Sequence, residues 1–342
     1  MINWQNVRKV LVVRLRSIGD TILSTPSLIA LRRFLPDAQI DILLEDWVAP
    51  ILDGFEAVDN VLTVSKDTKS RLKIARQIRR EKYDVAFNLH GGTTATFLIR
   101  ASGAKHRVGY KNYQYSFLYN HLLSSASDFW QREQNHSAEQ QLALLGFVGV
   151  PVEDKPKTHL NVTEKALESI NSKFKIQNSK FALFHPVAAF DTKQWATENY
   201  ALIAKYLSKK DFEIIAVATK KEREVLEKLR AYSKVSVITS DDLTLPEITA
   251  LASKSKLFVG NDSGIAHIAA AVQTPSVVIF GSSNRNHWRP WTNAPHKIVY
   301  EEFPCQPCAG YICKEFDQPK CILSVKTENV IKAIEKVLQR DV

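Results

Sequence analysis

The sequence predicts an α/β protein of two doubly wound domains, each a parallel sheet with helices on both faces. Short apolar runs alternate with segments of helical periodicity over residues 10–147, and the alternation resumes over residues 181–338. A polar, proline-bearing stretch, GVPVEDKPK at residues 149–157, separates the two series and reads as a linker. With 342 residues, 45% of them hydrophobic, the chain is long enough to bury two cores.

The first half follows a strand, helix, strand rhythm, which predicts parallel pairing. Its predicted strands are residues 10–15, 39–44, 61–64 and 83–89, and its predicted helices are residues 20–34, 68–82 and 136–147. The second half repeats this plan. Its predicted strands are residues 181–185, 212–218, 257–260 and 276–280, and its predicted helices are residues 198–207, 221–232, 265–272 and 325–338.

These elements divide the chain into an N-terminal domain over residues 1–155, a C-terminal domain over residues 156–325, and a last helix within residues 326–342 that is a candidate to pack back on the first domain. Open parallel sheets bind ligands at the carboxyl ends of their strands. We therefore expect the site in a cleft between the two domains, with its binding and catalytic residues just after the ends of strands.

The composition favours an acidic partner. Lys and Arg number 46 and Asp and Glu number 36, which gives a formal charge of +10. Nucleic acid, anionic lipid and a phosphorylated small molecule all fit this charge, and simple solubility is the alternative explanation. No apolar run approaches the roughly 18 residues that span a bilayer, and the first residues do not resemble a signal peptide. We expect a cytoplasmic protein.

The clearest motif is VGNDSGIAHIAAA, residues 259–271, in which a strand ends and a helix begins. Ser263 is expected to cap the helix, Gly264 lets a ligand approach the backbone, and Asp262 and His267 flank the helix start. The unbonded N–H groups of a first helical turn, together with the helix dipole, form an anion site. The alternative is a plain turn and cap.

Two further strand ends carry charged residues. Lys193 lies in a loop after residues 181–185, where a lysine suits a diphosphate. A solvated surface lysine is the alternative. Glu222 follows the strand at 212–218, where a carboxylate can accept both hydroxyls of a ribose. It can equally be a first-turn glutamate that favours the helix dipole, and taken alone this second interpretation is preferred.

The stretch RLRSIGDTILSTP, residues 14–26, follows the first predicted strand without a G-x-G-x-x-G phosphate loop. Asp20 stands there instead, with Gly19 before it to allow a sharp turn. Asp20 is either the N-cap of the next helix or a general base directed at an acceptor. On the second interpretation we expect Ser17, Gly19 and His90 to contact that acceptor.

Two other segments are unusual. Residues 66–82 hold eight basic and two acidic residues, with Leu72, Ala75 and Ile78 expected to face inward, so this helix is a candidate to rest on anionic membrane. A solvated face is the commoner explanation. The aromatic segment YKNYQYSFLY, residues 110–119, is expected to be core or to line a lid.

All four cysteines lie late in the chain, with the spacing C-x2-C-x4-C-x7-C. In a reducing compartment they are free thiols or metal ligands rather than disulfides. Such close spacing suits a tetrahedral zinc site, although the loops differ from common zinc-ribbon spacings. The residues concerned are Cys305, Cys308, Cys313 and Cys321.

Taken in order, these motifs resemble bacterial glycosyltransferase family 9, the ADP-heptose:lipopolysaccharide heptosyltransferases. VVRLRSIGDTILSTPSLIALRRFLPDAQIDIL is similar to the opening of that family, and GNDSGIAHIAAAVQTPSVVIFG to its donor signature. The resemblance covers nearly the whole chain. It implies a GT-B fold, two Rossmann-like domains facing across a cleft, with an acceptor on the first and an ADP-sugar on the second.

The resemblance also implies roles for single residues. The position of Asp20 is that of the catalytic base, and the positions of Lys193, Glu222 and residues 262–267 hold the donor. The chain departs from close relatives at residues 187–189, where Val-Ala-Ala replaces the hydroxyl residues that often precede the phosphate lysine. Hydroxyl contacts to the diphosphate must then be lost or supplied elsewhere.

The resemblance thus implies an inverting, metal-independent enzyme that needs no cofactor. It moves a heptose or related sugar from an ADP-sugar to a phosphorylated lipid or oligosaccharide acceptor of the lipopolysaccharide inner core. We expect it in the cytoplasm, with weak peripheral attachment to the anionic inner membrane and no nucleic-acid partner. Two alternatives are a sugar-nucleotide epimerase of the same fold and a non-catalytic anion-binding protein at the membrane surface.

Overall fold

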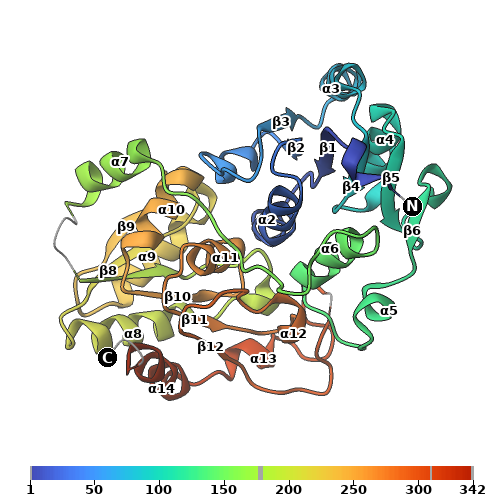
Figure 1. Cartoon of the computed structure of the whole chain (residues 1–342). Helices are drawn as coiled ribbons and strands as arrows, with labels where there is room; N and C mark the ends of the chain where they lie inside the picture. Colours follow the sequence, from blue (N-terminus) through green and yellow to red (C-terminus); the bar gives the residue numbers. More distant parts are fainter. Residues whose placement is uncertain (1, 176–179, 309, 340–342) are drawn as a thin grey trace. The chain divides into compact units, whose positions relative to one another are not determined.

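The computed structural model describes residues 2–175, 180–308 and 310–339. The chain divides into two compact units, residues 1–161 and 162–342 (Figure 1). Each unit holds one six-stranded sheet in which every pairing is parallel. The prediction of two doubly wound domains is confirmed.

In the first unit the strand order is β3-β2-β1-β4-β5-β6. The order reverses between β1 and β4, so the carboxyl ends of these two strands form the switch point where ligands bind in such sheets. The strands are β1 (Lys9–Val13), β2 (Gln39–Glu45), β3 (Asn60–Val64), β4 (Val85–Asn88), β5 (His106–Tyr110) and β6 (His121–Leu123). The helices are η1 (Trp4–Asn6), α1 (Ile18–Ile22), α2 (Thr25–Phe34), η2 (Ala49–Leu52), α3 (Thr68–Glu81), α4 (Gly92–Ser102), η3 (Ser116–Leu118), α5 (Ala126–Trp130) and α6 (Ser137–Gly146).

The second unit repeats this topology with the strand order β12-β11-β10-β7-β8-β9, and its switch point lies between β7 and β10. The strands are β7 (Phe181–His185), β8 (Glu213–Val217), β9 (Ile238–Ser240), β10 (Leu257–Asn261), β11 (Ser276–Ile279) and β12 (His296–Val299). The helices are α7 (Glu164–Phe174), η4 (Asp191–Lys193), α8 (Thr197–Ser208), η5 (Lys220–Glu222), α9 (Arg223–Tyr232), α10 (Leu245–Lys254), α11 (Gly264–Ala271), α12 (Arg285–Trp288), α13 (Lys320–Leu323) and α14 (Thr327–Leu338).

The long helix predicted over residues 20–34 is two helices. Residues 18–22 form α1, and α2 begins at Thr25 with Pro26 in its first turn. Proline is well placed in a first turn because its missing N–H would have no partner there. Because of this break, α1 is a short helix of five residues that follows β1 and contains Asp20.

The first unit ends at residue 161, six residues beyond the boundary predicted at 155. The reason is that the predicted linker is tied to the first unit. Lys155 Nζ donates to Glu139 Oε1 at 2.9 Å, and the backbone N–H of His159 donates to Thr25 Oγ1 at 3.1 Å. Leu160 is buried as well. The boundary therefore follows burial and hydrogen bonding rather than polarity.

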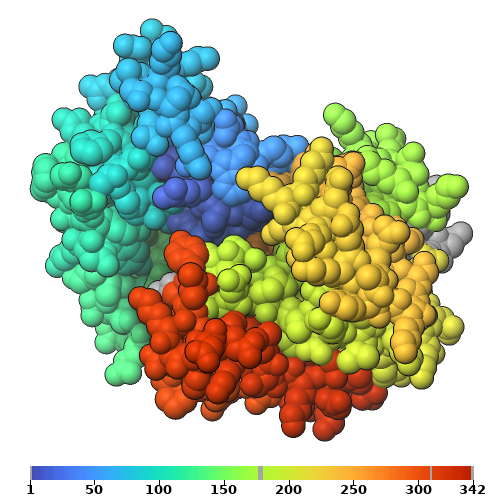
Figure 2. Space-filling model, turned by 180° about the vertical axis from the view of Figure 1, so that it is seen from behind, coloured from blue at the N-terminus to red at the C-terminus, as the bar shows by residue number. Residues whose placement is uncertain are grey.

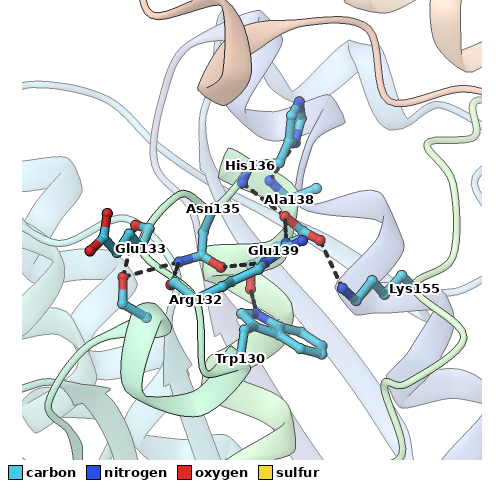
Figure 3. Close-up of polar contacts among 9 residues, drawn as sticks. Trp130, Arg132, Glu133, Asn135, His136, Ala138, Glu139 and Lys155 are labelled. Atoms are coloured by element: carbon cyan, nitrogen blue, oxygen red, sulfur yellow. Dashed lines mark hydrogen bonds and ion pairs between the residues drawn. The ribbon is translucent and has the colours of Figure 1, made fainter.

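Figure 3 shows how Glu139 anchors this segment to the start of α6. Burial alone would raise the pKa of the Glu139 carboxyl, but hydrogen bonds from the His136 backbone, Lys155 and Arg132 hold it below its ordinary value. Glu139 and His136 also form a capping box at the N-terminus of α6. The carboxylate therefore joins the linker and the helix in one network.

The last helix, α14, belongs to the second unit and packs against β11, β12 and α8. The expectation that it also packs back on the first domain stays a prediction. Its apolar stripe, which includes Val330, Ile334 and Val337, is buried in the core of the second sheet. Among the residues that the structure describes, no helix combines the length and apolar character needed to cross a membrane.

Candidate active site

The switch point of the first unit carries a charged cluster. Arg14 directly follows β1 and is buried, and its guanidinium forms an ion pair with the Asp20 carboxylate and donates to the Leu89 carbonyl oxygen at 2.7 Å. The Ser17 hydroxyl donates to the other carboxylate oxygen of Asp20. Both oxygens of Asp20 are thus held in place. Each oxygen has two lone-pair positions, so capacity for a further proton donor remains.

Asp20 is not the N-cap of α1, which was one of its two predicted roles. Ser17 takes that position, and the backbone N–H of Asp20 points to the Ser17 hydroxyl oxygen at 3.4 Å. Asp20 is the third residue of the helix. The sharp turn also belongs to Ser17 rather than Gly19, because Ser17 has a φ of +65°. A non-glycine residue in this region is uncommon and often marks a functional turn.

His90 lies beside the same cluster. Burial is the main cause that lowers its pKa to about 4, Arg14 and Arg16 lower it further, and Asp20 opposes them. The imidazole is therefore neutral at neutral pH. Its Nδ1 atom is buried and has no hydrogen-bond partner among the described residues. Neither Arg14, which lies within the strand predicted over residues 10–15, nor Arg16 was predicted as a site residue.

A pocket of about 330 Å³ opens at this edge of the first sheet. Its lining comes from the ends of β1, β2, β3 and β4 and from the first turns of α3 and α4. His90 lines it, as predicted for an acceptor contact, whereas Ser17 and Gly19 do not. The lining residues are Leu15, Arg16, Glu45, Val64, Ser65, Arg71, His90, Gly92, Thr93, Thr94 and Gln114.

The second unit brings together two of the residues predicted to hold a donor. Lys193 Nζ lies 2.8 Å from Asp262 Oδ2, and the Asp262 side chain is only 6% exposed. The Ser283 hydroxyl donates to the same carboxylate. Ser283 follows β11 and was not predicted. It places a hydroxyl beside Lys193, whose own loop has Val-Ala-Ala at residues 187–189.

Ser263 stands at the N-cap of α11, but its side chain makes no capping hydrogen bond, so that prediction is wrong. The hydroxyl instead contacts Nδ1 of His185 at 3.1 Å. His185 ends β7, 78 residues earlier, and a partner at that distance in sequence cannot be found by a local capping rule. Since the side chain is used elsewhere, it does not occupy the first-turn N–H groups of α11, which begins at Gly264.

The other two predicted donor residues are His267 and Glu222. His267 is the fourth residue of α11 and is buried. Glu222 Oε2 accepts from the Thr219 backbone N–H at 3.0 Å and from its hydroxyl at 2.8 Å, which is a capping box. Glu222 also lies close enough to His185 to oppose the lowering of its pKa by burial. The contacts of the Glu222 side chain are therefore those of a cap on its own helix, η5.

The loop that carries Lys193 is held in place by contacts that the local sequence does not predict. Trp195 is fully buried, and its backbone N–H donates to Asn261 Oδ1 at 3.2 Å. Gln194 accepts from the Ala188 N–H at 2.8 Å and donates to the Pro186 carbonyl at 2.6 Å. Asn261 Nδ2 is buried and has no partner among the described residues. This fixed loop gives Lys193 its position.

The buried His185 makes stability depend on acid. Burial lowers its pKa to about 4 from 6.5. Between these two pH values the unfolded chain binds more protons at this position than the folded chain does. The free energy of unfolding therefore decreases as the pH falls from 6.5 to about 4, and the contribution of His185 to this decrease is about 3 kcal/mol. We expect His185→Gln to flatten the decline in the denaturation midpoint over this range. Parallel pH profiles for wild type and variant would contradict the assignment.

The four cysteines are unpaired, and all of them line one pocket of about 400 Å³ in the second unit. Burial, followed by the neighbouring cysteines, raises the pKa of the Cys321 thiol, so this side chain is a thiol at neutral pH. Within the described residues, no three His, Cys, Asp or Glu side chains are arranged to hold a metal ion. The zinc hypothesis gains no support from this geometry.

Metal analysis tests that hypothesis directly. Protein purified without chelators should contain less than about a tenth of an equivalent of zinc or iron, the level of adventitious metal. One equivalent, lost together with thermal stability when Cys308 and Cys313 are replaced by serine, would show instead that the thiols converge on an ion.

Comparison with known proteins agrees with this geometry. A family model described as glycosyltransferase family 9 (heptosyltransferase) matches residues 71–317. The chain is 25% identical to lipopolysaccharide heptosyltransferase 3 of Escherichia coli (strain K12) over 349 residues, which cover 96% of this chain and 97% of that protein.

Two solved structures have a similar fold. One is a glycosyltransferase of family 9 from Veillonella parvula DSM 2008, with a TM-score of 0.84, 20% identity and 97% of each chain covered. The other is the E. coli ADP-heptose lps heptosyltransferase II, with a TM-score of 0.81, 19% identity, and 97% and 99% of the two chains covered. Together with the two parallel sheets, these likenesses confirm the GT-B fold that the sequence predicts.

Proposed function

Because the chain belongs to glycosyltransferase family 9, the heptosyltransferase family, we propose that it transfers a heptose from ADP-heptose to the inner core of a lipopolysaccharide. The names of its relatives support the sugar and the acceptor class, since they are a lipopolysaccharide heptosyltransferase and an ADP-heptose lps heptosyltransferase. The observation that carries the proposal is the Lys193–Asp262 pair beside the start of α11.

The donor diphosphate is assigned to the second unit. The first-turn N–H groups of α11 and its dipole supply fixed positive ends for the phosphates. Lys193 supplies a full charge and has two N–H donors besides the one that faces Asp262. The Ser283 hydroxyl lies against the same carboxylate. Glu222, near His185, is assigned to the ribose hydroxyls.

The proposed reaction is a single displacement that inverts the anomeric carbon. An acceptor hydroxyl attacks this carbon from the face opposite the diphosphate, and Asp20 takes the hydroxyl proton. The bond from the carbon to the diphosphate oxygen breaks, and ADP leaves with the electron pair. Lys193 and the start of α11 stabilise the charge that gathers on the leaving oxygen. A positioned base contributes about 100- to 10,000-fold.

The acceptor is assigned to the pocket of the first unit, which opens at the strand ends where Asp20 lies. Arg16 and Arg71 line this pocket, and Glu45 also lines it but accepts a hydrogen bond from Trp47 Nε1. Two arginines favour an anionic group, so a phosphorylated or carboxylated core sugar fits. Neutral His90 and the two threonines of α4 supply hydrogen-bonding groups for sugar hydroxyls.

The proposed chemistry uses a lysine and helix N–H groups for the leaving phosphate, and we propose that no metal ion is required. Transfer by protein that has been treated with a chelator and dialysed should retain the rate of untreated protein. Loss of activity that returns on adding a divalent cation would contradict metal independence but would leave the donor and acceptor assignments standing.

One assay separates the proposed function from its two alternatives. ADP release from ADP-heptose is followed with and without a lipopolysaccharide core acceptor that lacks the heptose. Acceptor-dependent release of ADP supports transfer. Conversion of the sugar nucleotide without an acceptor would instead show an epimerase. Binding without any turnover would show an anion-binding protein. Equal ADP release with and without acceptor would show hydrolysis only and would contradict the transfer proposal.

A further inference from the structure

Four large apolar side chains are exposed on the α3–α4 side of the first unit. Phe117 is 77% exposed, Phe97 53% and Leu72 52%, and Tyr115 is also exposed. The Phe97 and Tyr115 ring centroids lie 5.2 Å apart, and those of Tyr115 and Phe117 6.2 Å apart. The three rings therefore form a continuous apolar surface. The prediction that α3 turns Leu72 and Ile78 inward is confirmed for Ile78 and wrong for Leu72, and Ile74 shares the buried face with Ile78.

The backbone holds this aromatic surface in an uncommon conformation. Tyr115 has a φ of +59°, in the left-handed region that bulky side chains rarely adopt. Such a conformation costs free energy and persists where the surrounding structure or function requires it. Here it places the Tyr115 ring between Phe97 and Phe117. An exposed cluster maintained at this cost is typical of a binding surface rather than of a core.

Three of the exposed apolar residues are close in sequence to residues that line the acceptor pocket. Leu72 is next in sequence to the lining residue Arg71, and Tyr115 is next to the lining residue Gln114. Phe97 comes three residues after Thr94, which also lines the pocket and lies one turn earlier on α4. Helices α3 and α4 pack side by side (Figure 1). We name Leu72, Phe97, Tyr115 and Phe117 the apolar rim.

The surface around the apolar rim is cationic. Lys69, Lys73 and Arg76 are exposed on α3 and lie within one turn of Leu72. No acidic residue occurs in the sequence between Asp84 and Asp128, a stretch that includes α4 and the aromatic loop. Figure 2 shows the region of α3, in light blue, at the surface of the first unit. Apolar side chains among basic ones are the pattern of a surface that binds anionic lipid.

We infer that the apolar rim inserts into an anionic lipid bilayer and brings the acceptor pocket to the membrane surface. The rings and Leu72 enter the boundary between headgroups and acyl chains, while Lys69, Lys73 and Arg76 face the anionic headgroups. The occupant is a bilayer because charge and apolar area are both complementary to it. A lipid-anchored acceptor would then present its headgroup sugars directly to the pocket.

Vesicle sedimentation tests the apolar part of this surface. Wild-type protein should bind vesicles of phosphatidylcholine mixed with phosphatidylglycerol. Replacing Phe97 and Phe117 together by serine should weaken binding at least about tenfold, since partly buried phenylalanine side chains lose their apolar contacts. Leu202→Ser is the matched control, because Leu202 is 53% exposed on α8 of the second unit. Thermal midpoints of all variants establish that they are folded.

A second set of variants tests the charge. Replacing Lys69, Lys73 and Arg76 by glutamine should weaken binding by about fivefold or more for each charge removed. Wild-type binding should fall as salt rises, because the screening length shortens from about 8 Å at physiological ionic strength to about 3 Å at 1 M. Arg79 is left unchanged, since its guanidinium packs over Gly103 and supports the end of α4.

The outcomes separate this inference from the proposed function. Vesicle binding is measured without donor or acceptor, so it stands or fails whatever the enzyme transfers. If both are right, the serine variant loses transfer to a vesicle-borne acceptor but keeps transfer to a deacylated, water-soluble one. Wild-type protein that does not bind anionic vesicles would overturn the inference. Equal binding by wild type and the serine variant would do so too, as would a serine variant that changes only the oligomeric state.

Discussion

Replacing Lys193 by alanine is expected to weaken ADP binding by about ten- to a hundredfold and to lower turnover further. The expected loss of ADP affinity follows from the loss of one hydrogen bond between charged groups, which is worth about 1.5–3 kcal/mol. The larger effect on turnover follows because the leaving diphosphate gathers charge in the transition state, where the lysine acts most strongly. Calorimetry with ADP and steady-state assays with saturating donor measure the two effects separately.

Lys193→Ala also affects the stability of the fold, and this effect must be separated from the effect on ADP binding. Lys193 is the cation paired with Asp262, whose side chain is 6% exposed. Without the lysine, an unpaired buried carboxylate remains and destabilises the fold by about 3–5 kcal/mol. The same carboxylate would also repel the phosphates. Asp262→Asn and the double variant Lys193→Ala/Asp262→Asn therefore complete a cycle of four proteins.

The double variant decides the role of the lysine. It should regain much of the lost stability, because the stray charge is gone, yet still bind ADP at least about tenfold more weakly than wild type. If ADP affinity returns to the wild-type value in the double variant, the lysine is only the partner of Asp262. In that case the donor assignment would rest on the start of α11 alone.

The central strands could be predicted because burial on both faces leaves a plain apolar run, as in residues 181–185, which were predicted to the residue. The edge strands β6, β9 and β12 were not predicted, and neither was β5, which lies next to the edge strand β6. These four strands are short, and polar residues such as His106 and His121 interrupt them, since strands at or next to a sheet edge are only partly covered. Parallel edge strands take their identity from a neighbour that is distant in the sequence, and a local pattern does not contain that neighbour.

The site residues divide in the same way. Asp20 and Lys193 could be found because each is a charge at a strand end in a sheet whose ligands bind there. Asp262, the partner of Lys193, was predicted as well, but Arg14, the partner of Asp20, was not. Arg14 reads locally as an interruption of an apolar run, and the Ser263 side chain reads locally as a helix cap. Only the fold brings Arg14 to the Leu89 carbonyl, 75 residues away.

A common arrangement emerges from the two units. Each switch point holds a carboxylate paired with a cation, Arg14 with Asp20 in the first unit and Lys193 with Asp262 in the second. In the proposed mechanism the roles are exchanged. The carboxylate acts on the acceptor in the first unit while the arginine holds it, and the lysine acts on the donor in the second unit while the aspartate holds it.

Asp20→Asn is expected to lower turnover at least about 100-fold, the low end of what a general base contributes. ADP affinity should stay within about twofold of wild type, because the residues assigned to ADP belong to the second unit. The helix cap should survive, since Ser17 and not Asp20 supplies it. An asparagine still accepts a hydrogen bond from Arg14, but it cannot take a proton from a hydroxyl.

The structure also supplies the control that this substitution needs. Asparagine leaves Arg14 buried without a countercharge, and a positive charge at that place could slow the reaction without any role for a base. The double variant Arg14→Met/Asp20→Asn removes both charges, and its stability should lie nearer to wild type than that of the single variant. If Asp20 is the base, turnover per folded molecule stays at least about 100-fold low in the double variant as well. Recovery of turnover in the double variant would show that Asp20 only neutralises Arg14, and the proposed mechanism would then lose its base.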